Sequence, residues 1–210
     1  VVALSTDKAC EPTNLYGATK LASDKLFIAT NSSYAEGHKT IFSIVRYGNV
    51  LGSRGSIIPL FLSMKNAKEI PITDKRMTRF VITLDKAVNL VWHAFKDMRG
   101  GEVYVKKIPS IKIIELAKAI APKKKFRMIG IQPGEKLHEQ MIGMDDSYST
   151  YEYRDYYKIL PQIYNWHKDS KRIKNGQKVS ENFSYSSNNN TEWITKLELK
   201  EWINFKKKLF

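Results

Sequence analysis

The first twenty residues restrict the possible folds of this chain more than any other stretch. Residues 1–4 are all apolar and predict a buried strand. Residues 5–13 are mostly polar and include Pro12, which disfavours helix at the residue before it, so they predict a loop. A helix pattern begins near Tyr16, and residues 40–46, rich in β-branched side chains, predict the next strand. Strands that alternate with helices indicate an α/β fold built on a parallel sheet.

Tyr16 and Lys20 are the first candidates for chemistry. They are four residues apart on the predicted helix, so both side chains emerge on one face. A cation near a phenol favours its ionised form, which suits the pair to proton transfer. An exposed helical pair without a function has the same spacing. The run Thr6-Asp7-Lys8, at the carboxyl end of the first strand, favours the functional interpretation, because ligands bind at that edge of open α/β sheets.

Five stretches of the chain carry a resemblance to a known family. They are ALSTDKACEPTNLYGATKLASDKLF at residues 3–27, RYGNVLGSRGSIIPLF at 46–61, PITDKRMTRFVIT at 71–83, PGEKLHEQMI at 133–142 and NNNTEW at 188–193. In order and spacing they resemble the extended short-chain dehydrogenase/reductases. Within these they resemble the inverting UDP-N-acetylglucosamine 4,6-dehydratases that open pseudaminic acid biosynthesis. Tyr-x-x-x-Lys alone is a weak signal, whereas STDKA followed by YGATK at this spacing is specific.

The resemblance implies a hydro-lyase with an internal redox cycle. Enzymes of this family remove a hydride from C4 of the sugar, eliminate water from C5 and C6, and return the hydride to C6 with C5 inverted. By resemblance Asp7 is the acid for the departing C6 oxygen and Lys8 is the base at C5. Thr6 hydrogen-bonds the sugar near C4, and Tyr16 completes the catalytic set. Without this context, Asp7 would be interpreted as an Asx turn and Lys8 as a surface residue.

The resemblance also implies NADP as the cofactor. Lys20 would hold the nicotinamide ribose beside Tyr16, Leu4 and Ser5 would line the nicotinamide through their backbone, and Val50 would contact the cofactor. Such enzymes hold the dinucleotide pyrophosphate on a Gly-rich turn, and no G-x-x-G-x-x-G occurs in this sequence. We therefore expect the chain to be the C-terminal part of a longer protein and to be inactive alone. The alternative is a complete small domain whose initiator Met was removed.

The later motifs supply the candidates for binding the substrate, a nucleotide-sugar of the UDP-N-acetylglucosamine type. A diphosphate favours Arg, whose planar fork makes bidentate contacts with phosphate oxygens. The phosphate-binding role assigned to Arg79 could instead belong to Arg76, three residues before it. Besides Thr6, the substrate-binding residues implied by the resemblance are Asn49, Arg54, Arg79, Lys136 and Tyr185.

Two other enzyme interpretations stay open beside the inverting dehydratase. The retaining 4,6-dehydratases look similar around the Asp-Lys-Ala step but usually carry Met at the position of Tyr16, so Tyr16 favours inversion. Nucleotide-sugar 4-epimerases typically have Ser or Thr at the position of Asp7 and lack a Lys at position 8. The pair Asp7-Lys8 therefore speaks against an epimerase.

Composition limits where such a chain can act. The sequence is 42% hydrophobic and 27% charged, which is typical of globular proteins. Its longest apolar run, residues 57–62, is too short to span a bilayer, so we expect no membrane partner. The lone Cys10 excludes an internal disulfide and fits a reducing compartment, so we expect a cytoplasmic protein. We also expect the protein to form a homo-oligomer. His138 with flanking carboxylates lacks the spacing of a ligand set, so we expect no metal.

The net charge of +14 raises a rival interpretation of another class, a non-catalytic module that binds nucleic acid. The densest positive clusters are residues 123–125 and 206–208, and no zinc-finger, RNP or helix-turn-helix pattern accompanies them. A Lys-rich solvated surface explains the charge, and it would attract anionic nucleotides. We therefore expect no nucleic-acid partner.

The predicted fold class is α/β: the second half of a doubly wound Rossmann-type parallel sheet, with a smaller interwoven α+β substrate-binding domain. Residues 1–52 and 79–106 are assigned to the NADP-binding domain, and residues 53–78 and 107–210 to the substrate domain. A helix over residues 84–97 is expected to face the core with its large apolar side chains and to expose His93. A short helix is expected at 135–139 and a long loop at 169–190. The predicted core residues of the 84–97 helix are Leu84, Val88, Val91, Trp92 and Phe95.

Overall fold

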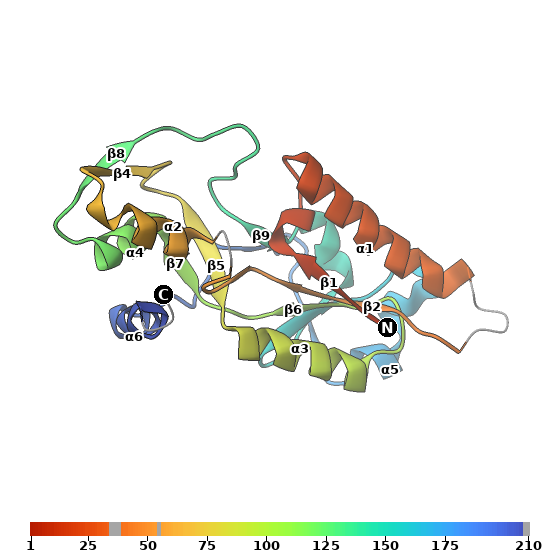
Figure 1. The fold of residues 1–210 in the computed structure, drawn as a ribbon. Helices are drawn as coiled ribbons and strands as arrows, with labels where there is room; N and C mark the ends of the chain where they lie inside the picture. Colours follow the sequence, from red (N-terminus) through yellow and green to blue (C-terminus); the bar gives the residue numbers. More distant parts are fainter. Residues whose placement is uncertain (34–38, 54–55, 208–210) are drawn as a thin grey trace. The chain divides into compact units, whose positions relative to one another are not determined.

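The computed structural model describes residues 1–33, 39–53 and 56–207. Their contacts divide the chain into two compact units, each built from three segments of sequence (Figure 1). Unit 1 comprises Val1–Tyr47, Asp85–Lys107 and Gln140–Ser186. Unit 2 comprises Gly48–Leu84, Ile108–Glu139 and Ser187–Phe210.

Unit 1 is built on a six-stranded mixed sheet with the strand order β1-β2-β6-β11-β10-β12. The strands β1, β2 and β6 run parallel, as the β-branched runs of the sequence predict. The other three strands add to β6 in antiparallel order. The bounds are β1 Val2–Thr6, β2 Ser43–Tyr47, β6 Val103–Lys106, β10 Thr150–Glu152, β11 Tyr156–Ile159 and β12 Gln177–Lys178.

Two helices cover the parallel strands, α1 (Leu15–Ser33) on one face and α3 (Leu84–Asp97) on the other (Figure 1). At the start of α1 the side chain of Asn14 accepts a hydrogen bond from Gly17 N at 2.9 Å, which satisfies one of the free amides of the first turn. The predicted α/β fold with a Rossmann-type parallel sheet is confirmed.

The predicted buried face of α3 is wrong for four of its five residues, whereas Val91 is half-buried and packs against the core. Trp92 is 60% exposed, and the face that packs on the sheet carries Ala87, Leu90 and Ala94 instead. Small alanines let the helix backbone approach the strands closely, and this face also keeps helical spacing. His93 is not exposed either, because its ring packs 4.4 Å from that of Tyr156 between centroids. The four large side chains exposed on α3 are Leu84, Val88, Trp92 and Phe95.

The segment Gln140–Ser186 belongs to unit 1. The sequence analysis had assigned all of residues 107–210 to the substrate domain. The reason is main-chain pairing: β11 lies against β6, and residues 169–190 hold short elements in place of the expected long loop. The elements of this segment, besides β10 to β12, are β9 Gln140–Ile142, η3 Met144–Ser149, η4 Ile163–Lys168, α5 Ser170–Ile173 and β13 Tyr185–Ser186.

A buried charge cluster lies under α3 in unit 1. Lys158 is 1% exposed, and its ammonium donates to Asp97 Oδ2 at 2.5 Å and to the carbonyl of Arg172 at 2.9 Å. Tyr104 donates to the same carboxylate oxygen at 2.8 Å, and Lys174 contacts the other one. Burial raises the pKa of Asp97, but these hydrogen bonds outweigh it and lower the pKa to about 2.

Unit 2 has two small sheets, β3-β5-β7 and β4-β8, packed with helices around an apolar core. The core includes Phe61, Ile70, Leu116, Leu199 and Ile203. The expected helix at residues 135–139 does not form, and this segment is turn and loop. The bounds are β3 Asn49–Val50, α2 Ile57–Ser63, η2 Met64–Asn66, β4 Glu69–Ile72, β5 Thr78–Ile82, β7 Ser110–Lys112, α4 Ile113–Ile120, β8 Lys125–Met128 and α6 Lys196–Lys207.

Candidate active site

The turn that follows β1 holds an acid and a base side by side. Residues Asp7–Ala9 form a single 3-10 turn (η1), which Thr6 caps by accepting from Lys8 N at 3.4 Å. The carboxylate of Asp7 is fully buried, and its Oδ1 accepts from Thr6 Oγ1 and from Lys8 Nζ, each at 2.9 Å. The second oxygen, Oδ2, is also buried and has no hydrogen-bond partner among the described residues. Most buried acceptors in native proteins have a hydrogen-bond partner, so this oxygen is an exception.

Gly17 brings the start of α1 against this turn. A Cβ at Gly17 would lie 2.5 Å from the carbonyl oxygen of Lys8 and 2.9 Å from Cβ of Pro12, closer than side chains approach. Because Gly has no Cβ, the helix and the turn can touch here. Lys20, one turn further along, donates to the carbonyl of Leu4 at 3.1 Å. The helix therefore presents its two predicted functional side chains beside the turn.

The surface around Tyr16 and Lys20 is open in the described structure. Tyr16 is 54% exposed and Leu4 is 53% exposed, and the ammonium of Lys20 lies at the backbone carbonyl of Leu4. This combination fits the flat ring and the ribose hydroxyls of a nicotinamide nucleotide. Tyr16, Lys20 and the backbone of residues 4–5 are the groups of this chain that could hold it.

Tyr47 is a neighbour that the sequence analysis missed. It is the register partner of Thr6, at the carboxyl end of β2. Burial raises the pKa of the Tyr47 phenol, and the nearby phenol of Tyr16 raises it further. The available signal was positional, because adjacent parallel strands end at the same edge of a sheet.

Unit 2 holds another group of the predicted residues. Asn49 and Val50 form β3, which pairs with Val81 and Ile82 of β5, and both are half-buried. Gly48, just before them, lies so close to β5 that a Cβ would stand 2.5 Å from that of Phe80.

The guanidinium of Arg79 points into its own unit. It donates to the carbonyls of Thr78 at 2.7 Å, Lys136 at 3.0 Å and Leu137 at 3.2 Å. Its Nε also lies 3.6 Å from Glu139 Oε1. In this structure Arg79 holds the loop that carries Lys136. Arg76 is the more exposed of the two arginines and pairs in bidentate fashion with Asp74.

Three side chains next to Arg79, two with hydroxyl groups and one with an imidazole, are joined by hydrogen bonds. Thr78 Oγ1 is 2.8 Å from His138 Nδ1 and 2.6 Å from Ser187 Oγ. Burial lowers the pKa of His138, and the charges of Arg79 and Arg76 lower it further. The sequence analysis considered His138 only as a metal ligand and missed this contact, because its partner Thr78 is 60 residues away along the chain.

Two predicted residues fall outside these groups. Tyr185 is buried on β13 of unit 1, where its ring packs 5.1 Å from that of Tyr157 and its backbone pairs with Ile142. Arg54 lies outside the described residues.

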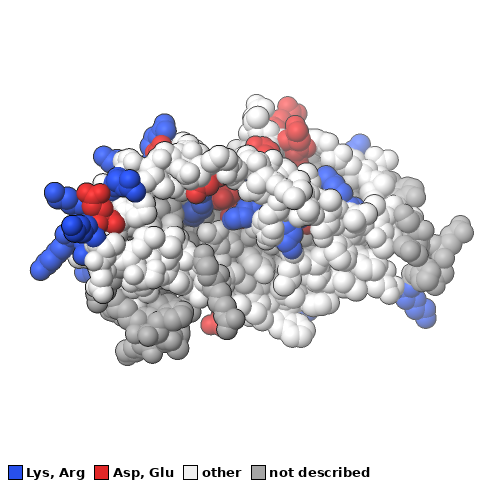
Figure 2. Space-filling model, turned by 45° about the horizontal axis from the view of Figure 1, so that its top comes forward, with Lys and Arg blue, Asp and Glu red and all other residues white. Residues whose placement is uncertain are grey.

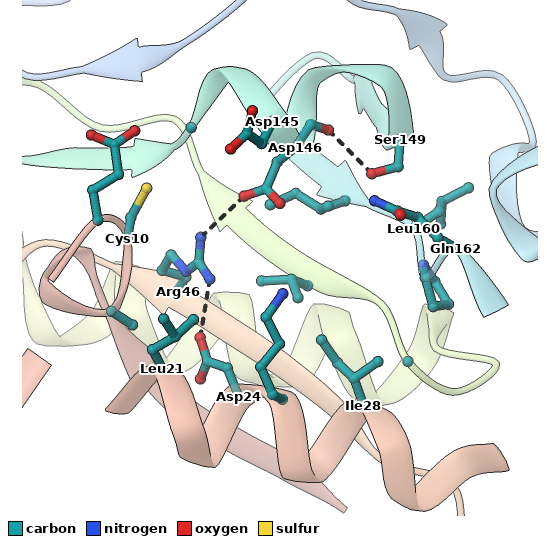
Figure 3. A pocket seen from close by; sticks show the side chains of 18 of the residues that line it. Cys10, Leu21, Asp24, Ile28, Arg46, Asp145, Asp146, Ser149, Leu160 and Gln162 are labelled. Atoms are coloured by element: carbon teal, nitrogen blue, oxygen red, sulfur yellow. Dashed lines mark hydrogen bonds and ion pairs between the residues drawn. The ribbon is translucent and has the colours of Figure 1, made fainter. Parts of the chain in front are cut away.

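A cavity of about 470 Å³ opens in unit 1 beside α1 (Figure 3). Its walls are α1, the loop after η1, and the segments η3 and η4. The guanidinium of Arg46 lies between the carboxylates of Asp24 and Asp146, at 3.0 and 4.0 Å (Figure 3).

Within residues 1–33, 39–53 and 56–207, no three His, Cys, Asp or Glu side chains are placed to hold a metal ion. None of the helices described is both long enough and apolar enough to cross a membrane. Lys and Arg gather at the end of unit 2 around β4 and β8, with acidic side chains among them (Figure 2).

The parallel strands β1, β2 and β6, with Tyr16 and Lys20 on the helix between the first two, define the chain as an extended short-chain dehydrogenase/reductase type. The chain belongs to the polysaccharide biosynthesis protein family, whose model matches residues 1–161.

Individual relatives agree with this membership. The chain is 55% identical to the inverting UDP-N-acetylglucosamine 4,6-dehydratase of Campylobacter jejuni subsp. jejuni serotype O:2, over 97% of this chain and 63% of the relative. It is 43% identical to a UDP-glucose 4-epimerase of Rickettsia canadensis, over 76% of this chain and 48% of the relative. The chain thus spans less than two thirds of the length of these proteins.

Solved structures show the same fold. The X-ray structure of Pen from Bacillus thuringiensis matches all of this chain and 63% of that one, with a TM-score of 0.83 and 32% identity. A dTDP-glucose 4,6-dehydratase from Streptomyces venezuelae, solved with NAD and TYD bound, matches 65% of this chain and 49% of that one. Its TM-score is 0.57 and its identity is 22%.

Proposed function

We propose that this chain supplies the proton-transfer groups of a UDP-N-acetylglucosamine 4,6-dehydratase that inverts C5. The observation that carries the proposal is the contact of Asp7 with Lys8, on a turn that touches the helix of Tyr16 and Lys20. A plain reductase or epimerase needs only the Tyr and Lys pair, whereas elimination of water needs an additional acid and base. The 55% identity to an inverting dehydratase supports the same assignment.

The proposed roles follow from the groups that each residue presents. A bound nicotinamide dinucleotide, NADP in our prediction, supplies hydride transfer at C4 and its return at C6. Tyr16 accepts the proton of the C4 hydroxyl, and Thr6 orients that part of the sugar. Lys8 removes the C5 proton, which the C4 ketone acidifies, and Asp7 protonates the C6 oxygen as it leaves. Lys20 holds the nicotinamide ribose, beside the backbone of Leu4 and Ser5.

The ion pair of Asp7 and Lys8 explains how one site holds both an acid and a base. In the ion pair, the ammonium of Lys8 donates a proton to the carboxylate of Asp7 across 2.9 Å. Transfer of that one proton across the hydrogen bond gives a carboxylic acid and a neutral amine, which are the forms that elimination needs.

Asn49, Val50, Arg54, Arg79, Lys136 and Tyr185 are proposed to bind the ligands, and their contacts divide them by role. Asn49 and Val50 form the short strand β3. Asn49 is proposed to contact the sugar, and Val50 is proposed to contact the cofactor. Arg79 and Lys136 are proposed to bind the diphosphate, and Arg79 also holds the loop that carries Lys136. The roles of Arg54 and Tyr185, the homo-oligomer and the cytoplasmic location stay predictions.

The test uses the full-length protein that contains this chain, with UDP-N-acetylglucosamine and NADP. We expect a proton NMR spectrum of a 4-keto-6-deoxy sugar with C5 inverted. Retention at C5 would assign the protein to the retaining branch, and a 4-epimer without loss of water would assign it to the epimerases. We expect Lys8→Ala to abolish loss of water while the cofactor still binds. The matched control is Lys118→Ala, at an exposed pair on α4 of unit 2.

A further inference from the structure

We propose that Asp24 and Arg46 are positioning residues that set the Asp7–Lys8 turn against the helix of Tyr16 and Lys20. The inference rests on the proposed function, because it concerns how these four groups are held in register. Neither residue carries a proposed chemical role. Both lie in unit 1, and both are at least nine-tenths buried.

The first link joins the end of β1 to α1. Ser5, which directly precedes Thr6 and the catalytic turn, donates from its hydroxyl to Asp24 Oδ2 at 2.9 Å. Asp24 lies one helical turn after Lys20 and two turns after Tyr16, so it shares their side of α1. The bond therefore fixes the strand end along the helix. Together with the bond from Lys20 to Leu4 O at 3.1 Å, it gives two successive strand residues a tie to one helix.

The second link comes from the neighbouring strand. Arg46 on β2 is the register partner of Ser5, and its Nη2 donates to the same Asp24 Oδ2 at 3.0 Å. Figure 3 shows the guanidinium reaching from β2 toward Asp24 on one side and toward Asp146 on the other. One carboxylate oxygen thus receives a donor from each of two adjacent strands. A charged hydrogen bond in such a dry place is stronger than a neutral one.

The third link holds the turn from its far side. Nη1 of Arg46 donates to the carbonyl of Met141 at 2.8 Å, and Met141 is the middle residue of β9. Strand β9 lies against η1. Beside this contact, Gln140 donates to Glu11 Oε1 at 3.0 Å, just beyond the turn. Arg46 therefore ties down both structures that enclose the turn, α1 through Asp24 and β9 through Met141.

This arrangement needs the fork of an Arg. The guanidinium donates in two directions at once, to a carboxylate and to a carbonyl on a different element. Lysine carries a comparable charge but only a single nitrogen, and it cannot serve both acceptors in the same geometry. Removing either link lets the turn move relative to Tyr16, and a displacement of about 1 Å in a reacting group lowers a rate by roughly 10²-fold.

The test compares Arg46→Lys and Asp24→Asn with wild type in the full-length protein. We expect kcat, expressed per active site from a cofactor titration, to fall by roughly 30- to 100-fold in both variants. KM for the nucleotide-sugar should change by less than about threefold, because neither residue is proposed to touch it. Reduced cofactor, followed at 340 nm, should build up during turnover, because loss of water becomes slower than hydride transfer. The control is Arg172→Lys, another Arg of unit 1 that pairs with Asp169 and stacks on Trp166.

A purely structural role predicts a different result. It would reduce the number of active sites and leave kcat per active site, and the level of reduced cofactor, as in wild type. That result, or a kcat within threefold of wild type, overturns the inference. If the wild-type protein itself shows no turnover, the proposed function fails, and amide hydrogen exchange then decides on the positioning role. We expect faster exchange in residues 6–11 of Arg46→Lys with no change in α3, and equal exchange in residues 6–11 refutes the positioning role.

Discussion

Replacing Asp97 by Asn tests whether the charge cluster under α3 stabilises unit 1. The change keeps the size of the side chain and an acceptor for the hydroxyl of Tyr104, which donates to Oδ2 at 2.8 Å. It removes the carboxylate that pairs with the ammonium of Lys158 at 2.5 Å, and Lys158 is 1% exposed. Removing one partner of a buried pair leaves an uncompensated charge, which costs ~3–5 kcal/mol.

The expected loss is at the lower end of that range. Asp97 keeps a tenth of its side chain exposed, so water relieves part of the cost. We expect Asp97→Asn to lower the free energy of unfolding of unit 1 by about 3 kcal/mol. For a cooperative unfolding unit the size of the 210-residue chain, that corresponds to a fall of roughly 6–12 °C in the melting temperature. Lys174→Gln removes the more exposed partner of Asp97 and should cost less than about 1 kcal/mol.

The assay is thermal unfolding of the full-length protein, followed by circular dichroism and tryptophan fluorescence. The double variant Asp97→Asn/Lys158→Met should be more stable than Asp97→Asn, because no buried charge is left unpaired. A single variant within about 0.5 kcal/mol of wild type, or a double variant at the sum of the two single losses, refutes the reasoning. Since the pKa of Asp97 is lowered to about 2 in the fold, its contribution is present above pH ~4 and is lost as the pH falls toward 2.

Three further changes test other parts of the structure. Gly17→Ala should lower kcat by roughly tenfold or more while the protein still folds. The reason is that the new Cβ would lie 2.5 Å from the carbonyl oxygen of Lys8, so the helix and the turn must move apart. A kcat equal to that of wild type would contradict this reasoning. Burial lowers the pKa of His93 despite the opposing charge of Asp97, and nearby lysines lower it further, so stability should fall as the pH drops below ~6.5. His93→Gln should flatten the dependence of the melting temperature on pH between about 7.5 and 5.5, and an unchanged slope would exclude His93 as its source. Leu116→Ala in the core of unit 2 should cost ~2–4 kcal/mol in urea unfolding, and a loss under about 1 kcal/mol would show that the core closes over the gap.

Sequence alone determined the parts of this protein that depend on neighbours along the chain. The strand, turn and helix of the first 33 residues follow from apolar runs, Pro12 and the four-residue spacing of Tyr16 and Lys20. The motifs of the same stretch indicated the family, and the family model that matches residues 1–161 confirms it. Local patterns succeed here because the backbone geometry of one strand and one helix sets the spacing of their side chains.

Where two sets of residues fitted the same pattern in the sequence, the tertiary structure decided which set is buried. Both faces of α3 keep helical spacing, and the alanine face packs on the sheet while Trp92 stays exposed, because close approach to the strands counts for more than side-chain size. The direction of Arg79 depends on carbonyls 57 and 58 residues away.

The link from Ser5 through Asp24 to Arg46 spans three elements, and no local pattern marks it. Hydrogen bonds of this kind depend on distances in space, and those distances exist only after the sheet and its helices have packed. The identity of the catalytic candidates was therefore a property of the sequence. Their alignment, on which a rate depends, is a property of the fold.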